Sequence, residues 1–262
     1  MSGIDREKLL SINRIEKDSS FYPPLLREIF DPPLFLYCRG PLPNPEKPAV
    51  ALVGTRRPSA AASMQAYVLG REFARAGITV ISGLALGIDA LAHRGCLEGG
   101  GCTAAVLGSS VDEVYPASNR DLARRILKAG GSLLSEYVPG TRPRKHYYPQ
   151  RNRIISGLAR ATVIVEAPAA SGALHTARFA LDQGRDLFVG SSGLASPFGE
   201  GTRRLAQEGC PVISHAAEIL AEWGMAPDLD EQNSRNGGSL EPVPEKGGQE
   251  WLALSLKKEL SL

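Results

Sequence analysis

The chain has 262 residues, of which 43% are hydrophobic and 22% are charged. These fractions are ordinary for soluble globular proteins and the length allows one sizeable core, so they exclude a wholly disordered chain and a membrane protein. Thirty basic and 28 acidic residues leave a net charge of +2. A protein that is basic over its whole surface is therefore excluded, and any surface for nucleic acid must be local.

Residues 1–45 form the first segment, an N-terminal lead-in that starts charged and is proline-rich from Pro23 to Pro45. Prolines at this density break helices. We therefore expect one short helix and an extended stretch that packs onto the main domain. No apolar stretch in MSGIDREKLL is long enough for a signal peptide, and no uncharged run in the chain approaches membrane-spanning length. We expect a cytoplasmic protein with no membrane contact.

The main domain is predicted over residues 46–224, where short apolar runs alternate with longer amphipathic stretches. Runs that are apolar at nearly every position fit strands covered on both faces, as in a parallel sheet. The runs cover residues 49–53, 78–82, 103–108, 131–136, 162–167, 186–190 and 211–214. Two helical stripes lie between them, namely Ala62, Ala66, Leu69, Phe73 and Ala76, and then Leu174, Ala177 and Leu181. This order predicts an α/β fold with an open, doubly wound, mostly parallel sheet.

The end of the chain has a different composition. Residues 225–250 are polar, acidic and rich in Gly and Pro, which is typical of a flexible linker. Residues 251–262, WLALSLKKELSL, form a short tail that could be an amphipathic helix but is too short for a domain. The four cysteines, Cys38, Cys96, Cys102 and Cys210, lie far apart without a CxxC pair. We expect buried free thiols, and no metal or cofactor.

Ligands of open α/β sheets bind beyond the carboxyl ends of the strands, so the loops there are the candidate sites. The first such loop, Gly54-Thr55-Arg56-Arg57-Pro58-Ser59, combines a glycine, two arginines and a helix start. This combination suits a phosphate, because free backbone N–H groups and guanidinium groups both attract anions. The alternative is a capped turn with solvated arginines.

The second loop is SGLALGIDALAH, residues 82–93. Gly83 and Gly87 resemble part of a dinucleotide loop, but the full GxGxxG is absent, so NAD binding is only weakly indicated. Asp89 and His93 lie four residues apart and could form a catalytic pair. We favour the simpler interpretation, in which Asp89 complements the helix dipole and His93 completes a hydrogen bond.

The segment PGTRPRKHYYPQRNR, residues 139–153, carries five formal positive charges, two adjacent tyrosines and no acidic residue. Basic groups interleaved with rings are typical of single-stranded nucleic-acid sites, because the charges follow the phosphates while bases stack on the rings. A solvated charged loop with inward-packed tyrosines is the alternative.

Three glycine-bearing loops, residues 166–172, 190–193 and 199–202, are predicted at the same edge of the sheet. Ser171-Gly172 could be a helix cap, a second anion contact, or both. Familiar catalytic motifs such as GxxxxGK[ST], GxSxG and HExxH are missing.

Taken in order, these segments resemble the DprA/Smf family of DNA-processing proteins. The resemblance is carried by GTRRPS, VISGLALGIDALAH, YPASNRDL, LLSEYVPG, YPQRNRIISGL and VIVEAPAASGALHTARFAL, together with the lead-in SSFYPPLLREIFDPPLFLYCRG. It covers residues 20–222 and implies an extended Rossmann-like fold, binding and protection of single-stranded DNA during DNA uptake, and delivery of RecA recombinase onto that strand. It also implies a homodimer and no catalysis.

By motif position, the family's DNA contacts fall on Arg56, Lys145 and Tyr148, and on Arg151 and Arg153. The resemblance further implies that Gly54, Gly83 and Gly172 offer backbone to phosphates, and that Asn152 orders its loop. With the neighbouring loop residues, the predicted nucleic-acid site is Gly54, Thr55, Arg56, Arg57, Gly83, Lys145, Tyr148, Arg151, Arg153, Ser171 and Gly172.

The sequence departs from the family pattern in three places. Tyr148 replaces a commoner Phe, Gly190-Ser191-Ser192-Gly193 replaces a usual Pro-Gly, and the helical N-terminal and winged-helix C-terminal domains of many members are not expected here. Two alternatives stay open. One is a nucleotide-binding or nucleoside-monophosphate-hydrolysing enzyme of the same superfamily, although Leu205 stands where its PGGxGTxxE motif needs Glu. The other is a pure interaction protein that does not touch DNA.

Overall fold

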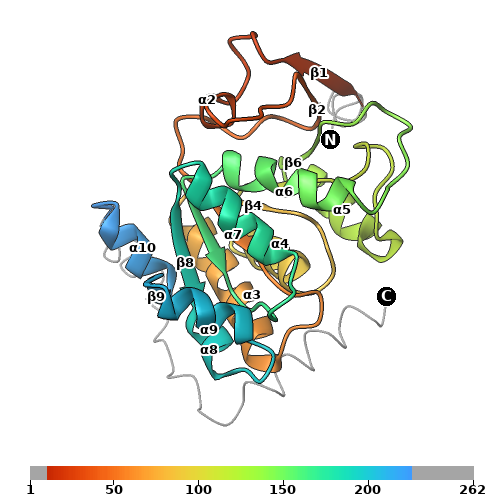
Figure 1. Ribbon diagram of the computed structural model, residues 1–262. Helices are drawn as coiled ribbons and strands as arrows, with labels where there is room; N and C mark the ends of the chain where they lie inside the picture. The colour runs from red at the N-terminus through yellow and green to blue at the C-terminus, as the bar shows by residue number, and fades with distance from the viewer. Residues whose placement is uncertain (1–10, 226–262) are drawn as a thin grey trace, which may run out of the picture. The chain divides into compact units, whose positions relative to one another are not determined.

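The computed structural model describes residues 11–225, so the predicted tail and all but Met225 of the predicted linker lie outside the described residues. The described part contains a nine-stranded sheet with helices on both faces (Figure 1). All seven apolar runs predicted as strands are strands. Their bounds are β3 (Ala49–Val53), β4 (Thr79–Ser82), β5 (Thr103–Val106), β6 (Ser132–Ser135), β7 (Ala161–Ile164), β8 (Asp186–Gly190) and β9 (Val212–Ile213).

The strand order confirms the doubly wound fold. It is β1-β2-β6-β5-β4-β3-β7-β8-β9, and every neighbouring pair from β6 to β9 is parallel. The chain runs outward from β3 to β6 and then returns to place β7 on the other side of β3. The strand order therefore reverses between β3 and β7, and the crevice beyond their carboxyl ends is where such sheets bind ligands.

The lead-in is more regular than predicted. Its short helix is α2 (Pro24–Arg27), as expected, but its extended stretches are two strands, β1 (Ile12–Glu16) and β2 (Phe35–Arg39). They pair antiparallel with each other, and β2 pairs antiparallel with β6. The lead-in therefore continues the sheet of the main domain instead of only packing onto it.

Two layers of helices cover the sheet. On one face, α3 (Ala60–Arg75), α4 (Ile88–Glu98), α5 (Arg120–Lys128) and α10 (Ala216–Glu222) pack on alternate strand residues such as Leu52 and Ala105. On the other, α6 (Tyr147–Gly157), α7 (Ala173–Asp182) and α9 (Glu200–Gln207) pack on residues such as Ala51 and Val106. The remaining short elements are the 3-10 turn η1 (Ala117–Asn119) and α8 (Ser191–Ala195).

The stripe predicted on α3 is confirmed for Ala62, Ala66, Leu69 and Phe73, which are fully buried. Its last residue, Ala76, is half-buried and is the C-cap of the helix. The stripe on α7 is wrong at its end. Leu181 is 60% exposed, whereas Ala177 and Ala180 are buried. Successive helical residues are rotated by about 100°, so the residue after Ala180 turns away from the sheet.

The cysteines are free, as predicted, but not all are buried. Cys38 and Cys96 lie in the core, Cys210 is half-buried, and Cys102 is exposed where the chain enters β5. Over residues 11–225, no three His, Cys, Asp or Glu side chains are grouped so that they could hold a metal ion. No helix in that range is long and apolar enough to cross a bilayer.

Candidate nucleic-acid interface

The loop after β3 is fastened to the end of β7. The Thr55 amide donates to the Glu166 carbonyl at 2.8 Å, and the Ser59 hydroxyl donates to the Glu166 carboxylate at 2.5 Å. The same Ser59 oxygen accepts from the Ala62 amide at 3.2 Å and so caps α3. These bonds fix the backbone at the point where the strand order reverses. Arg56 and Arg57, between the fastened ends, remain exposed.

Arg56 meets the aromatic residue predicted to stack on bases. Its guanidinium carbon lies 5.6 Å from the centroid of the Tyr148 ring, a cation–π distance. Arg56 follows β3, and Tyr148 is the second residue of α6, which follows β6. Lys145 lies two residues before α6 and is exposed. Among the described residues, neither Arg56 nor Lys145 has an acidic side chain within ion-pair distance.

The Tyr148 ring rests on a glycine that sequence reasoning missed. A Cβ at Gly108 would lie 2.8 Å from a Tyr148 ring carbon, so only glycine lets the ring lie there. The Tyr148 hydroxyl is buried and has no hydrogen-bond partner within residues 11–225. Burial raises the pKa of this hydroxyl, and so does the neighbouring Tyr115, while Arg151 and Arg56 oppose the shift. The ring therefore stays a neutral stacking surface at physiological pH.

The adjacent aromatic, Tyr147, is half-buried like Tyr148 but is engaged by other side chains of the protein. It stacks on Tyr137 with ring centroids 3.9 Å apart, and the His146 ring meets it edge-on at 4.6 Å. The Arg144 guanidinium lies 5.9 Å from the centroid of the same ring. These contacts occupy Tyr147 and order the loop before α6. A sequence with two adjacent tyrosines does not by itself say which of the two faces the site.

Arg151 is not at the surface. It is 4% exposed, and its guanidinium donates to the carbonyls of Gly83, at 2.7 Å, and Val106. The Gly83 amide donates to the Asp89 carboxylate at 3.1 Å, so both backbone polar groups of Gly83 are used within the protein. Burial lowers the pKa of Arg151 and raises that of Asp89, and the charge of each opposes the shift of the other. Arg151 therefore joins the ends of β4 and β5 beneath the site.

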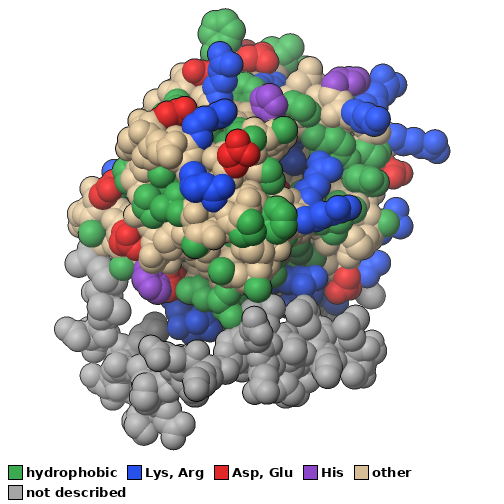
Figure 2. Space-filling model, turned by 60° about the horizontal axis from the view of Figure 1, so that its bottom comes forward, with side chains coloured by type: hydrophobic (Ala, Val, Ile, Leu, Met, Phe, Trp, Pro, Cys, Tyr) green, Lys and Arg blue, Asp and Glu red, His purple; other side chains and the backbone are tan. Residues whose placement is uncertain are grey.

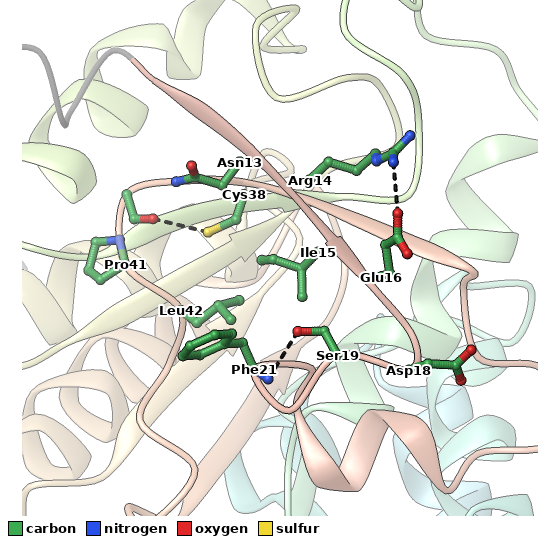
Figure 3. A pocket seen from close by; sticks show the side chains of 11 residues that line it. Asn13, Arg14, Ile15, Glu16, Asp18, Ser19, Phe21, Cys38, Pro41 and Leu42 are labelled. Carbon is green, nitrogen blue, oxygen red and sulfur yellow. Dashed lines mark hydrogen bonds and ion pairs between the residues drawn. The ribbon is translucent and has the colours of Figure 1, made fainter.

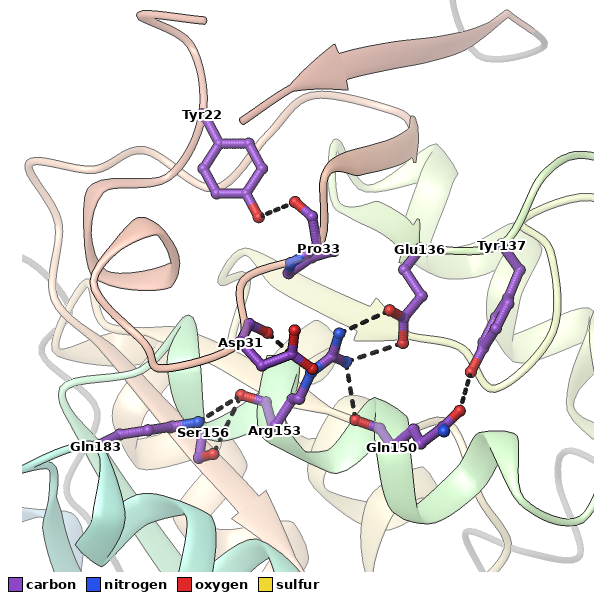
Figure 4. Close-up of polar contacts among 9 residues, drawn as sticks. All are labelled: Tyr22, Asp31, Pro33, Glu136, Tyr137, Gln150, Arg153, Ser156 and Gln183. Atoms are coloured by element: carbon purple, nitrogen blue, oxygen red, sulfur yellow. Dashed lines mark hydrogen bonds and ion pairs between the residues drawn. The ribbon is translucent and has the colours of Figure 1, made fainter. Parts of the chain in front are cut away.

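Arg153 is also engaged. Figure 4 shows its guanidinium held by the Glu136 carboxylate, at 2.9 and 2.7 Å, and by Asp31, whose carboxylate lies at 3.1 Å. Since Asp31 belongs to the lead-in and Glu136 follows β6, Arg153 ties three parts of the chain together. Of the five cations in residues 139–153, only Arg142, Arg144 and Lys145 are exposed.

The loop before α7 offers an open glycine. Gly172 is exposed, and a Cβ added to it would meet nothing within 4 Å. The Asn152 side chain donates to the Gly172 carbonyl at 3.1 Å, which agrees with the loop-ordering role expected for Asn152. The Ser171 hydroxyl accepts from the Ala173 amide at 3.3 Å, next to Gly172, which is the N-cap residue of α7.

Asp89 and His93 do not form a catalytic pair at the surface. Both are buried, and His93 Nδ1 lies 2.7 Å from the Thr103 hydroxyl. Burial, aided by the charge of Arg151, lowers the pKa of His93 to about 3. The interpretation favoured from the sequence, a histidine that completes a hydrogen bond, is confirmed.

Basic side chains are spread over one face of the described residues. On the face shown in Figure 2, Lys and Arg side chains stand among hydrophobic ones, with fewer acidic side chains between them. A separate groove of about 780 Å³ lies in the lead-in and is lined by Ile15, Phe21 and Leu42, among others (Figure 3). All residues of its lining fall between Asn13 and Leu42, so none comes from the loops described above.

Comparisons with known proteins show the family to which the chain is similar. The family model described as DNA recombination-mediator protein A matches residues 13–224. Protein Smf of Synechocystis sp. is 42% identical over 82% of this chain, and DNA processing protein DprA of Bacillus subtilis is 38% identical over 80%. The chain spans only 54% of the length of the Synechocystis protein and 71% of that of the Bacillus protein.

Two solved structures have the same Rossmann-like fold. An X-ray structure of DNA processing protein A from Streptococcus pneumoniae superposes with a TM-score of 0.74 at 34% identity, covering 83% of this chain and 76% of that one. A structure of DNA processing protein A from Helicobacter pylori, reported for its single-stranded DNA binding mode, superposes with a TM-score of 0.71 at 29% identity. It covers 81% of this chain and 95% of that one.

Proposed function

Because the chain belongs to the DNA recombination-mediator protein A family, we propose that it binds single-stranded DNA across the loops that follow β3, β5, β6 and β7. The observation that carries this proposal is the exposed Arg56 guanidinium lying over the Tyr148 ring at the crevice where the strand order reverses. A cation beside a ring is what a flexible polyanion with bases requires, since the phosphate meets the charge while a base stacks on the ring.

The predicted site residues divide into contacts and supports. Arg56, Arg57 and Lys145 are exposed cations that pair with phosphates, and Tyr148 stacks on a base. Backbone around Ser171-Gly172 approaches the phosphates as the strand passes. Gly54 and Thr55, predicted as backbone contacts, belong with the supports, because Gly54 packs closely on Ile88 and both backbone polar groups of Thr55 are bonded to Glu166 and Ile88. Arg151, Arg153 and Gly83 hold the loops from beneath, because their polar groups are bound within the protein.

The consequences for partners follow from the family. We propose that the bound strand is protected and then passed to RecA recombinase during uptake of DNA, which is what mediation of recombination requires. Two copies of the chain would join two such sites into one longer track, so we propose a homodimer acting in the cytoplasm. Light scattering at several protein concentrations tests the oligomeric state.

We also propose that the chain acts by binding and not by catalysis. The nucleotide-hydrolysing alternative needs a carboxylate at position 205, but the side chain there is Leu205, which is buried in the core. The neighbouring Thr202 hydroxyl accepts from the Ala167 amide at 2.8 Å, so this glycine-bearing segment is packed against the end of β7. Release of free base from a nucleoside monophosphate would contradict this proposal.

Titration of labelled single- and double-stranded oligonucleotides at several salt concentrations tests DNA binding. We expect the single strand to bind more tightly, with an affinity that falls steeply with salt and depends little on base sequence. Lack of binding to any oligonucleotide at low salt would favour the pure interaction protein instead.

A further inference from the structure

A second aromatic ring stands beside Tyr148. Tyr115 is 53% exposed, and its ring centroid lies 6.2 Å from that of Tyr148, with the two planes tilted by 51°. Tyr115 comes from the segment between β5 and α5, so it reaches the site from a different strand than Tyr148 does. The predicted set of site residues did not include Tyr115.

The backbone around Tyr115 is held in place although its ring is exposed. The buried Asn119 side chain donates to the carbonyls of Leu84 and Ala85, at 2.9 and 3.2 Å. On the other side, the Ser109 hydroxyl donates to the Glu113 carbonyl at 2.6 Å. The ring is therefore exposed to solvent although its backbone is fixed. An exposed ring forgoes the stabilisation that burial gives a tyrosine with a purely structural role.

The two rings are spaced almost widely enough to hold a base. A flat ring in van der Waals contact with another sits about 3.5 Å from it, so a base between two rings needs centroids about 7 Å apart. The observed separation is 6.2 Å with a tilt of 51°. To hold a base, the exposed Tyr115 ring has to turn through the 51° tilt and move slightly outward, while Tyr148 keeps its place against Gly108.

From this geometry we propose that Tyr115 and Tyr148 clamp one unstacked base between them. The clamp rests on the proposed function, since it assigns a second base contact within the same site. It also supplies a reason to select single strands: in a duplex the faces of each base are covered by its neighbours, so no base is open on both sides. Arg56, which lies over the Tyr148 ring in the free protein, then follows the adjacent phosphate.

The test compares a 12-nucleotide oligo-dT with a 12-nucleotide oligomer of abasic residues, which has the same phosphates and no bases. We expect the parent protein to prefer oligo-dT. Tyr115→Ala should reduce this preference by between about fivefold and about a hundredfold, since stacking on one ring contributes that much per base. Binding of the abasic oligomer should not change. Tyr115→Phe, which keeps the ring, should retain the preference.

The controls separate the clamp from the site as a whole. Lys145→Ala should weaken both oligomers alike, and Phe21→Ala, an exposed ring in the lead-in, should change neither. If Tyr115→Ala left the preference intact, or weakened both oligomers equally, the clamp would be wrong while the proposed function stood. If the parent bound neither oligomer, the proposed function would fail and the clamp with it.

Discussion

The Arg151 guanidinium and the Gly83 carbonyl, 2.7 Å apart, join the end of β4 to the first turns of α6 from inside the protein. A Cβ at Gly83 would lie 2.5 Å from the same guanidinium. The two residues therefore depend on each other: the arginine needs the carbonyl, and the carbonyl is reachable because its residue has no side chain. This buried pair lies beneath the surface at which Arg56 and Tyr148 meet.

The first prediction concerns the contribution of buried Arg151 to stability. Arg151→Met should lower the free energy of unfolding by about 3 to 5 kcal/mol, because the variant leaves the buried Gly83 and Val106 carbonyls without their donor and removes a charge that favours the ionised Asp89 carboxylate. Urea unfolding followed by circular dichroism measures the change. Arg57→Met, at an exposed position, should change stability by no more than about 0.5 kcal/mol. Equal stability of the two variants would show that Arg151 is not a support.

The second prediction concerns the exposed cations. Arg56→Ala and Lys145→Ala should each weaken binding of every single-stranded sequence to the same degree, because phosphate contacts carry no base information. Each should also reduce the slope of log affinity against log salt by about 1. Tyr148→Ala should lower affinity with less change in that slope. Fluorescence anisotropy at four salt concentrations gives both quantities.

A matched control for the cations is Arg124→Ala. Arg124 is an exposed arginine on α5 that pairs with Asp121 at 3.2 Å. The Arg124→Ala variant should bind DNA as tightly as the parent, with the same slope of log affinity against log salt. If Arg56→Ala and Lys145→Ala behaved like Arg124→Ala, the assignment of phosphate contacts would be wrong.

Gly108→Ala gives the third prediction. The added methyl group would overlap the half-buried Tyr148 ring and force it out of the position it holds against residue 108. We therefore expect a loss of DNA affinity close to that of Tyr148→Ala, with a much smaller loss of stability than a core substitution gives. Anisotropy and urea unfolding of the two variants make the comparison. Unchanged DNA binding in Gly108→Ala would mean that the position of the ring does not matter.

Gly172→Ala gives the fourth prediction. Unlike Gly108→Ala, this variant is not expected to lose stability. The Gly172 backbone is helical, with φ of −59°, and the added methyl group meets nothing within 4 Å. The variant should be as stable as the parent or up to about 1 kcal/mol more stable. If backbone at this position approaches a phosphate, the methyl group should still weaken DNA binding. Equal binding by parent and variant would remove Gly172 from the site.

The fifth prediction is a pH dependence of stability that His93 produces. Its pKa is about 3 in the folded protein, below the ordinary value of 6.5, so the unfolded chain takes up a proton between these values and the folded protein does not. The contribution of neutral His93 to the free energy of unfolding is fully present above pH 6.5 and is lost as the pH falls toward 3. At pH 5 the loss should be about 2 kcal/mol relative to pH 8.

His93→Gln isolates this effect, because glutamine does not titrate. Urea unfolding of parent and variant at pH 8 and pH 5 gives two differences to compare. The variant should be less stable than the parent at pH 8 and should lose less stability on acidification. An identical loss in both proteins would show that His93 is not the group responsible.

Much of this protein could be read from its sequence, for local reasons. Strands covered on both faces need apolar residues at nearly every position, so runs such as AVALV and TVIV are predicted as buried strands from the sequence alone. The alternation of such runs with helical stripes gives the doubly wound order, and that order fixes which loops share the edge of the sheet. Family motifs in those loops then point to Arg56, Lys145 and Tyr148.

Only the tertiary structure decided which charged and aromatic side chains reach the surface. Arg151 and Lys145 stand in the same basic segment, but one is buried under two carbonyl groups and the other is exposed. Tyr147 and Tyr148 are adjacent and both half-buried, but Tyr147 stacks on Tyr137 whereas Tyr148 meets Arg56. The direction of each side chain depends on contact partners that follow distant strands, such as Gly83, Gly108 and Tyr137. The local sequence around a side chain does not show which of these partners it will contact.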